Sequence, residues 1–162
     1  MMDLKPLQTS RHSPDPAPWL FDEFARPRRV LVVEGQPEVR ELISLTLETG
    51  PYTILLAEDG ERALALARAH RPDIVVMDVV LPGRVDGFDL CRQLKHDART
   101  RSAPVLILSA KSQAADRAMG FAAGADDYMT KPFSPLRLQH RVRELLNGRT
   151  PHHAPSPEPS MV

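Results

Sequence analysis

Polar groups suited to phosphoryl chemistry follow four short apolar runs of the sequence. They are a carboxylate at Glu34, a second carboxylate at Asp78, a hydroxyl at Ser109 and an ammonium at Lys131. A carboxylate can attack a phosphoryl group, while an ammonium and a hard cation offset the charge on its oxygens. These groups can act together only if the four runs end at one edge of a sheet. Whether they do depends on the strands and helices that the sequence predicts around them.

Strands and helices alternate through residues 28–148. Apolar runs predict five strands, at 30–33, 52–57, 74–77, 105–108 and 128–129. Apolar residues at helical spacing follow each run, and Gly124 and Gly148 end the last two helices. The third and fourth runs are continuously apolar, which is typical of strands buried on both faces of a parallel sheet.

This alternation predicts an α/β fold, a doubly wound (βα)₅ parallel sheet in the flavodoxin-like order 2-1-3-4-5. Ligand sites in such folds lie at the carboxyl ends of the strands. The polar groups named above therefore form the candidate site.

Proline marks the boundaries of the domain. Nine of the 16 prolines lie in residues 1–27 and 149–162, which lack apolar periodicity, so we expect two flexible tails around a domain at 28–148. Trp19, Leu20, Phe21 and Phe24 interrupt the first tail. They form either a short docking motif or a weakly ordered segment that packs on its own domain.

The bulk composition excludes several classes of function. The 21 basic and 21 acidic residues balance, which argues against direct nucleic-acid binding. No apolar run approaches the length of a membrane span, and prolines and charges stand where a signal peptide needs an apolar core. We therefore expect a cytoplasmic protein without membrane contact. The single cysteine, Cys91, falls on an apolar helical stripe and is predicted to pack in the hydrophobic core.

Five motifs agree with one family in order and spacing. They are VLVVEGQPEVRELI at 30–43, VVMDVVLPG at 75–83, DGFDLCRQL at 86–94, PVLILSA at 104–110 and GADDYMTKPF at 124–133. Together they resemble the receiver domain of bacterial two-component response regulators, over essentially the whole of residues 28–148. Any one of these motifs alone would be weak evidence.

The resemblance implies a role for each residue of the candidate site. Asp78 matches the phosphoacceptor, and Ser109 and Lys131 match the residues that contact the phosphoryl group. Tyr128 matches the aromatic residue that switches together with Ser109, and the Lys131–Pro132 peptide bond is expected to be cis. Mg²⁺ is expected to be held by Asp78, the backbone carbonyl of Val80 and an acid pair that matches Glu34 and Gly35.

Two features depart from the family pattern. Gly35 stands where the second acid of the pair usually binds Mg²⁺ directly, and it offers no side-chain oxygen, so we expect weak Mg²⁺ binding. The loop after Asp78, which contains LPGRV, is one residue longer than the common form. Such an insertion costs little, and we expect it to leave the Asp78 carboxylate unaffected.

These observations favour a single-domain response regulator. It would accept a phosphoryl group on Asp78 from a histidine kinase or phosphotransfer protein and signal by binding a downstream protein, through the fourth helix, fifth strand and fifth helix around Tyr128. It would not be an enzyme beyond assisting its own phosphorylation and dephosphorylation. The alternative is a pseudo-receiver, an interaction module that works without phosphorylation because of Gly35. An aspartyl-phosphate hydrolase is rejected, because Val80 stands where such enzymes place a second acid.

Overall fold

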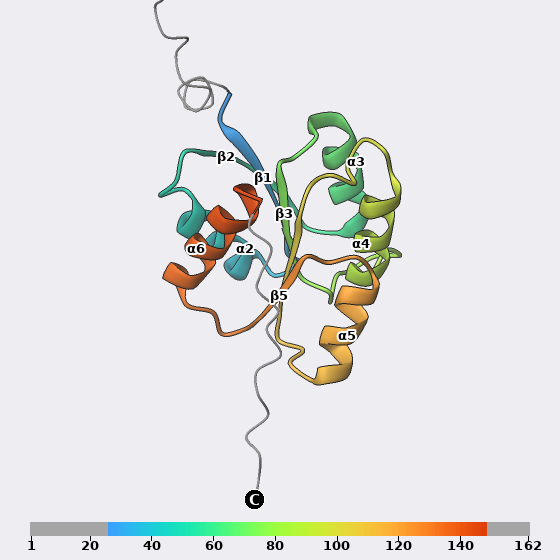
Figure 1. The fold of residues 1–162 in the computed structure, drawn as a ribbon. Helices are drawn as coiled ribbons and strands as arrows, with labels where there is room; N and C mark the ends of the chain where they lie inside the picture. Colours follow the sequence, from blue (N-terminus) through green and yellow to red (C-terminus); the bar gives the residue numbers. More distant parts are fainter. Residues whose placement is uncertain (1–25, 149–162) are drawn as a thin grey trace, which may run out of the picture.

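The computed structural model describes residues 26–148 (Figure 1). The predicted tails, and with them the motif at Trp19–Phe24, lie outside the described residues apart from Arg26 and Pro27.

Five strands form one parallel sheet in the order β2-β1-β3-β4-β5. The strands are β1 (Arg28–Val33), β2 (Tyr52–Ala57), β3 (Ile74–Met77), β4 (Val105–Ser109) and β5 (Asp127–Thr130). The helices are α2 (Pro37–Leu47), α3 (Gly60–His70), α4 (Gly87–His96), α5 (Ala114–Ala122) and α6 (Pro135–Leu146). The predicted fold and strand order are confirmed.

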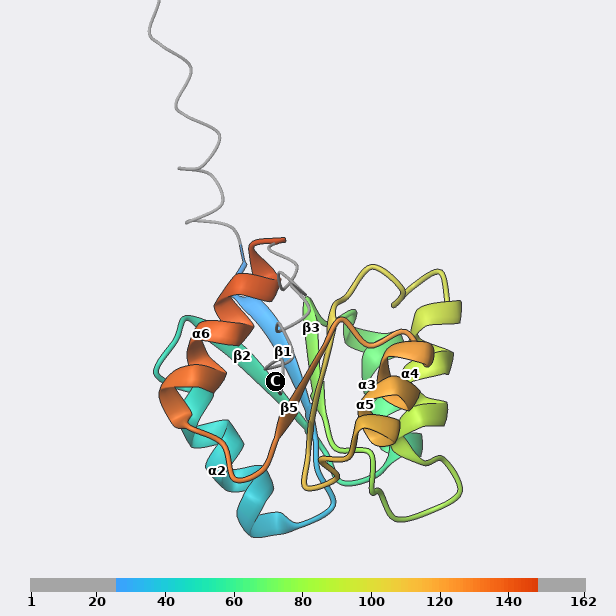
Figure 2. The same ribbon diagram turned by 60° about the horizontal axis from the view of Figure 1, so that its bottom comes forward.

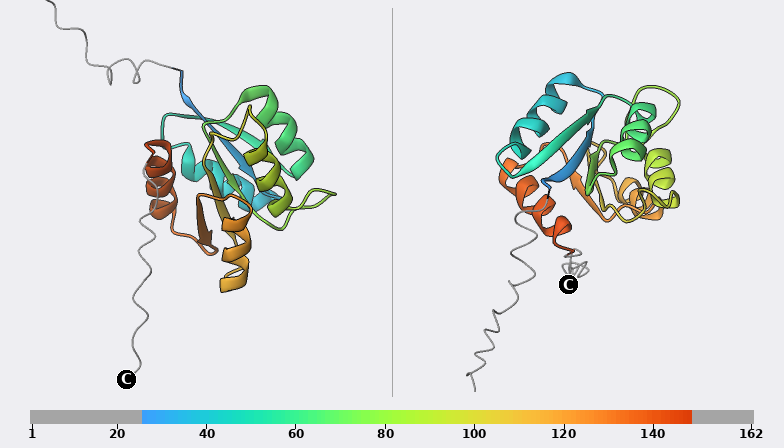
Figure 3. Two further views of the ribbon diagram at one scale, coloured as in Figure 1. Left: turned by 45° about the vertical axis from the view of Figure 1, so that its right-hand side comes forward. Right: turned by 90° about the horizontal axis from the view of Figure 1, so that it is seen from above.

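Helices cover both faces of the sheet (Figures 1 and 2). On one face, α2 and α6 pack over Val30 and Val32 of β1. On the other face, α3, α4 and α5 pack over Leu31 and Val33 of the same strand. Successive residues of a strand point to opposite faces, so each central strand contributes to both apolar layers. The view from above in Figure 3 shows the sheet between these two layers of helices.

Helix caps fix where the chain leaves the sheet edge and turns back. The Asp59 side chain accepts a hydrogen bond from Arg62 N at 2.7 Å, and Asp86 accepts one from Asp89 N at 2.9 Å. These carboxylates satisfy backbone donors that a first helical turn leaves without partners. Pro37 and Pro135 begin α2 and α6, where a missing N–H is harmless. Each helix therefore begins at the edge of the sheet that carries the candidate site.

Tyr128 of β5 lies in a tight space beneath α5. A Cβ atom added at Gly120 would lie 2.9 Å from both Ile107 Cδ1 and Tyr128 Cδ2. Only a glycine allows the tyrosine ring to lie so close to the helix backbone. The ring is part of the apolar core, and Tyr128 is only 3% exposed.

Between Arg26 and Gly148, no helix is both long enough and apolar enough to cross a membrane.

Candidate functional site

Three of the predicted residues meet at the carboxyl edge of the sheet. Lys131 Nζ donates to Asp78 Oδ2 at 2.8 Å and to Glu34 Oε2 at 2.7 Å. Glu34 follows β1, Asp78 follows β3 and Lys131 follows β5. Glu34 is 1% exposed and Asp78 is 7% exposed. One ammonium therefore bridges two buried carboxylates, and each of these three groups follows a different strand.

The contacts with Asp78 and Glu34 keep Lys131 in its charged form. Burial by itself lowers the pKa of Lys131, but the hydrogen bonds and charges of Asp78 and Glu34 outweigh burial and raise the pKa above its ordinary value. The group is thus an ammonium at neutral pH. Two carboxylates and one ammonium leave the cluster one negative charge in excess, which favours the approach of a further cation.

The backbone after β3 holds the Asp78 carboxylate in place. Asp78 Oδ1 accepts hydrogen bonds from Val79 N at 2.7 Å and from Val80 N at 3.2 Å. Because the other oxygen faces Lys131, both oxygens have defined partners. A carboxylate fixed in this way, beside a charged ammonium, has the arrangement that nucleophilic attack on a phosphoryl group requires.

Ser109 and Tyr128 share a partner residue, Lys111. The buried Ser109 hydroxyl accepts a hydrogen bond from Lys111 N at 3.2 Å, and the Tyr128 hydroxyl donates to Lys111 O at 2.6 Å. Burial raises the pKa of Tyr128 above its ordinary value. The Arg117 guanidinium lies over the Tyr128 ring, 5.3 Å from its centre. The two predicted switch residues are therefore brought together through the backbone that follows β4.

The Ser109 hydroxyl does not contact the charged cluster of Glu34, Asp78 and Lys131. Within residues 26–148, no hydrogen bond joins its hydroxyl to Asp78 or Lys131. Its predicted role as a phosphate ligand requires the hydroxyl to leave Lys111 N, and it stays a prediction. The cis Lys131–Pro132 peptide bond is confirmed.

The donor set for Mg²⁺ is small. Among residues 26–148, no three acidic, histidine or cysteine side chains converge as a metal site would require. Glu34 and Asp78 nonetheless lie close together, since both contact the Lys131 ammonium, which occupies the position between them. One or two carboxylates with several waters can hold Mg²⁺ beside a phosphate, so these residues fit the ion, but with fewer ligands than an acid at position 35 would provide.

Pro82 occupies the space beside Gly35. A Cβ atom added at Gly35 would lie 2.9 Å from Pro82 Cδ. An acidic side chain at this position therefore requires the proline ring to move. This contact was not predictable from the sequence, because the two residues belong to separate loops that meet only in the folded chain.

The longer loop after Asp78 is anchored to α3. Arg84 N donates to Glu61 Oε1 at 2.9 Å, and this backbone hydrogen bond is the main cause that lowers the pKa of Glu61. Val85 lies against Gly60, where an added Cβ atom would meet Val85 Cβ at 2.8 Å. The loop is thus held against α3, and the Asp78 carboxylate has the backbone hydrogen bonds described above.

Comparison with known proteins assigns the class of protein that this fold and cluster define. Residues 30–143 match the Response regulator receiver domain family, and the chain belongs to this family. The chain is 43% identical over 118 residues to the DNA-binding dual master transcriptional regulator RpaA of Synechocystis, covering 73% of this chain and 48% of RpaA. It is 40% identical over 131 residues to the alkaline phosphatase synthesis regulator PhoP of Bacillus subtilis, covering 81% and 53%.

Solved structures agree with this assignment. A putative response regulator from Chloroflexus aurantiacus superimposes with a TM-score of 0.71 at 36% identity, covering 75% of this chain and 98% of that one. The receiver domain of the sensor histidine kinase PA1611 from Pseudomonas aeruginosa, with magnesium coordinated in its active-site cleft, gives 0.70 at 30% identity, covering 75% and 98%. The chain spans about half the length of the curated relatives it matches.

An isolated acid such as Glu34 could be a solvated side chain, and the structure contradicts this alternative. Glu34 is buried and paired with Lys131, and its other oxygen accepts from Gln36 N at 3.1 Å. Its expected role toward Mg²⁺ stays a prediction. No local pattern signals the pair of Glu34 and Lys131, because 97 positions separate the two residues.

Proposed function

We propose that this receiver domain accepts a phosphoryl group on Asp78 and signals through protein contacts. The observation that carries the proposal is the Asp78 carboxylate held 2.8 Å from the Lys131 ammonium at the carboxyl edge of the sheet. The histidine of a kinase or phosphotransfer protein is the donor that membership of the family implies.

The proposed transfer needs one bond to form and one to break. An Asp78 oxygen forms a bond to phosphorus while the phosphorus–nitrogen bond of the donor breaks, and the departing imidazole nitrogen keeps the electron pair. Lys131 faces the phosphoryl oxygens and offsets their charge. Mg²⁺, when bound by Asp78 and the Val80 carbonyl, would offset the remaining charge. Ser109 is proposed to turn from Lys111 N to the phosphoryl group.

Incubation with acetyl phosphate tests this function directly. We expect one acid-labile phosphate per chain, formed faster with Mg²⁺ than without it. No incorporation at any Mg²⁺ concentration, from acetyl phosphate or from a panel of histidine kinases, would instead favour the pseudo-receiver alternative.

The proposed cellular setting follows from the family. The relatives of this receiver include the DNA-binding transcriptional regulator RpaA and the transcriptional regulatory protein PhoP, and the chain spans about half of their length. We propose that this chain works as a single-domain response regulator in the cytoplasm and passes its signal to a downstream protein rather than to DNA. The balanced charge, with 21 basic and 21 acidic residues, supports this choice.

Replacing Gly35 by aspartate is expected to strengthen Mg²⁺ binding. A carboxylate adds an oxygen ligand and a full negative charge, and loss of even outer partners costs metal sites about 10- to 100-fold in affinity. Because the new Cβ atom would lie 2.9 Å from Pro82 Cδ, the proline ring must shift, and this reduces the gain. The measurement is calorimetric titration with Mg²⁺.

Two further variants separate charge from crowding in this test. Gly35→Asn has nearly the same size without the charge and is expected to gain little. The double variant Gly35→Asp with Pro82→Ala removes the crowding and is expected to gain more than Gly35→Asp alone. Equal Mg²⁺ affinity in all four proteins would mean that Gly35 does not limit the site.

The partner surface is proposed to lie on α5, β5 and α6 around Tyr128. Beryllofluoride, a phosphoryl mimic, is expected to change amide hydrogen exchange there, because Ser109 and Tyr128 both bond to the backbone of Lys111 and a turn of the Ser109 hydroxyl breaks one of these bonds. The measurement is hydrogen–deuterium exchange with mass spectrometry. Changes confined to α2 and α3 would contradict this surface.

A further inference from the structure

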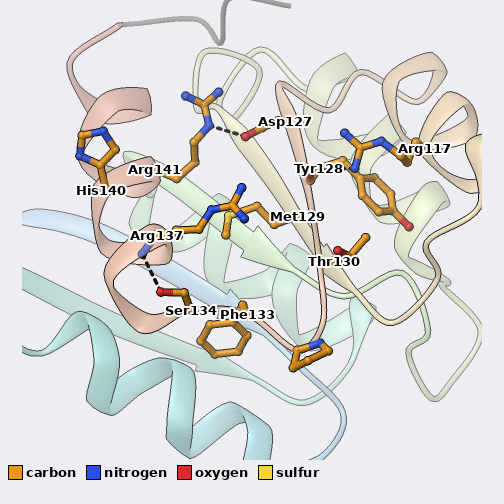
Figure 4. Close-up of a pocket in the computed structure, with 11 residues that line it drawn as sticks. Arg117, Asp127, Tyr128, Met129, Thr130, Phe133, Ser134, Arg137, His140 and Arg141 are labelled. Carbon is orange, nitrogen blue, oxygen red and sulfur yellow. Dashed lines mark hydrogen bonds and ion pairs between the residues drawn. The ribbon is translucent and has the colours of Figure 1, made fainter. Parts of the chain in front are cut away.

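The hollow on α5, β5 and α6 contains an arginine whose charge is neutralised within the domain. Figure 4 shows Arg141 bonded to Asp127, and Arg141 also pairs with Glu144. This hollow belongs to the partner surface proposed above. A different hollow lies at the amino edge of the sheet, the edge opposite Asp78, and the charges there are arranged differently.

This amino-edge hollow lies where the chain enters β1, β3 and β4, and the C-terminal end of α6 borders it. Its volume is about 480 Å³. Four arginines line it together with a single acid: Arg26, Arg28, Arg71, Arg99 and Asp73. The balanced charge of the whole chain therefore conceals a local excess of positive charge at this edge.

Backbone hydrogen bonding holds Arg28 and Arg71 on neighbouring segments of the chain. Asp73 N donates to Arg29 O at 2.8 Å, directly before β3 begins to pair with β1. Arg28 comes one residue before the acceptor of this hydrogen bond, and Arg71 comes two residues before the donor. The two arginines therefore line one hollow from adjacent segments.

Two of the four arginines are paired and two are not. Arg99 and Arg26 each contact an aspartate, at 2.9 and 3.5 Å. Arg28 and Arg71 have no carboxylate within 4 Å anywhere in residues 26–148. The hollow therefore offers two guanidinium groups to an anion.

The helix ends at this edge have other hydrogen-bond donors. The C-terminal end of a helix carries a partial negative charge that attracts cations. At the end of α3, Arg29 donates to His70 O, and at the end of α4, the Thr100 hydroxyl donates to Leu94 O. The two unpaired guanidinium groups make no such hydrogen bond within the described part of the chain, so they remain available to a ligand.

The backbone at Arg71 has a conformation that favours glycine. Its φ is +46°, and within residues 26–148 it is the only non-glycine residue with a positive φ. The residue ends α3, a position where glycine is common because it adopts this conformation without steric cost. Residues held in such conformations cluster at binding sites. An arginine at this position therefore favours a role for its guanidinium group.

We propose that the amino-edge hollow binds a nucleoside diphosphate or a ligand of similar size with two phosphate groups. Each unpaired guanidinium can hold one phosphate through two parallel hydrogen bonds. A volume of about 480 Å³ lies within the range of small-molecule sites. Apolar side chains, among them Pro104 and Leu146, form part of the wall and suit the flat face of a base.

This site is independent of phosphoryl acceptance. It lies at the opposite edge of the sheet from Asp78, and its ligand would be bound by arginines rather than through Mg²⁺. Binding should therefore proceed in the presence of EDTA. It should weaken as the salt concentration rises, because exposed charges are screened beyond about 10 Å at 0.1 M salt.

Calorimetric titration of the full chain with ADP in EDTA tests the proposal. We expect ADP to bind, and inorganic pyrophosphate to bind at the same site more weakly, because it lacks the base. Adenosine lacks the phosphates, and sulfate supplies only one anionic group. Both should bind at least about tenfold more weakly than ADP, since hydrogen bonds to charged groups contribute that much to affinity.

The variant Arg71→Gly separates binding from folding. It removes one guanidinium and relieves the left-handed backbone, so ADP affinity should fall about tenfold or more while the urea midpoint stays equal or rises. Arg28→Gln should weaken ADP binding similarly. The control is Arg62→Gln with Arg84→Gln, which removes two exposed arginines at the carboxyl edge and should leave ADP affinity unchanged.

Several results would overturn the proposal. The wild-type chain could fail to bind ADP, or the double variant Arg28→Gln with Arg71→Gly could bind it as tightly as wild type. An equal loss of affinity in the Arg62→Gln, Arg84→Gln control, or sulfate binding as tight as ADP binding, would show only a general attraction of anions. Adenosine binding as tight as ADP binding would exclude a phosphate site, and loss of both stability and affinity in Arg71→Gly would assign that residue a structural role. Acetyl phosphate labelling of the same proteins tests phosphoryl acceptance separately.

Discussion

Replacing Asp78 by asparagine is expected to abolish acid-labile phosphate incorporation completely. The carboxamide oxygen can still accept the hydrogen bonds from Val79 N and Val80 N that hold Asp78, so the loop after β3 keeps its position. The amide lacks the anionic oxygen that attacks phosphorus, so no covalent intermediate forms. The measurement is incorporation of labelled phosphate from acetyl phosphate, or from a kinase that phosphorylates the wild-type chain.

A matched control separates loss of the nucleophile from a general change of charge. Asp89 lies on the surface of α4, with 49% of its side chain exposed, and is paired with Arg92. Asp89→Asn makes the same chemical change away from the cluster and should leave labelling unchanged. Full labelling of the Asp78→Asn protein would identify another residue as the acceptor.

Replacing Lys131 by methionine is expected to destabilise the folded state by about 3–5 kcal/mol, the cost of leaving buried charges without their partner. Glu34 and Asp78 would then face each other as two buried carboxylates. The measurement is the free energy of unfolding from urea denaturation at neutral pH.

The neighbouring surface lysine provides the comparison. Lys111 is exposed, and its contacts to Ser109 and Tyr128 are made by backbone atoms. Lys111→Met is therefore expected to stay within about 0.5 kcal/mol of wild type, as is usual for surface substitutions. A loss of stability in Lys131→Met no larger than that of Lys111→Met would show that the Glu34–Lys131–Asp78 cluster contributes nothing to folding.

The fold was predictable because its signals are local. Continuous apolar runs such as Ile74–Met77 coincide with strands, and Gly124, with a φ of +104°, closes α5 as expected. Strand ends were less well defined: β4 extends to Ser109, and β5 runs from Asp127 to Thr130 rather than over two residues. Backbone hydrogen bonds to neighbouring strands set these ends. Polar residues also make such hydrogen bonds, but a search for apolar runs in the sequence does not detect them.

The site was predictable only where the topology alone brings residues together. The ends of parallel strands meet at one edge, so the convergence of Asp78 and Lys131 followed from the alternation of strands and helices. The burial of Glu34 and the proximity of Pro82 to Gly35 did not follow. Both depend on contacts between side chains and loops that are far apart in the sequence. No periodic pattern of the sequence records such contacts.

The close packing of Tyr128 against Gly120 has a consequence for the resting state of the domain. If the ring turned outward, it would leave an aromatic-sized void, because glycine has no side chain to fill the space and Ile107 alone cannot. Voids in a protein interior destabilise it by about 24 cal/mol for each cubic ångström that does not collapse. The inward ring is thus the default because of its volume, before any hydrogen bond is counted. Whatever moves Tyr128 must contribute enough binding free energy to offset an empty space beneath α5.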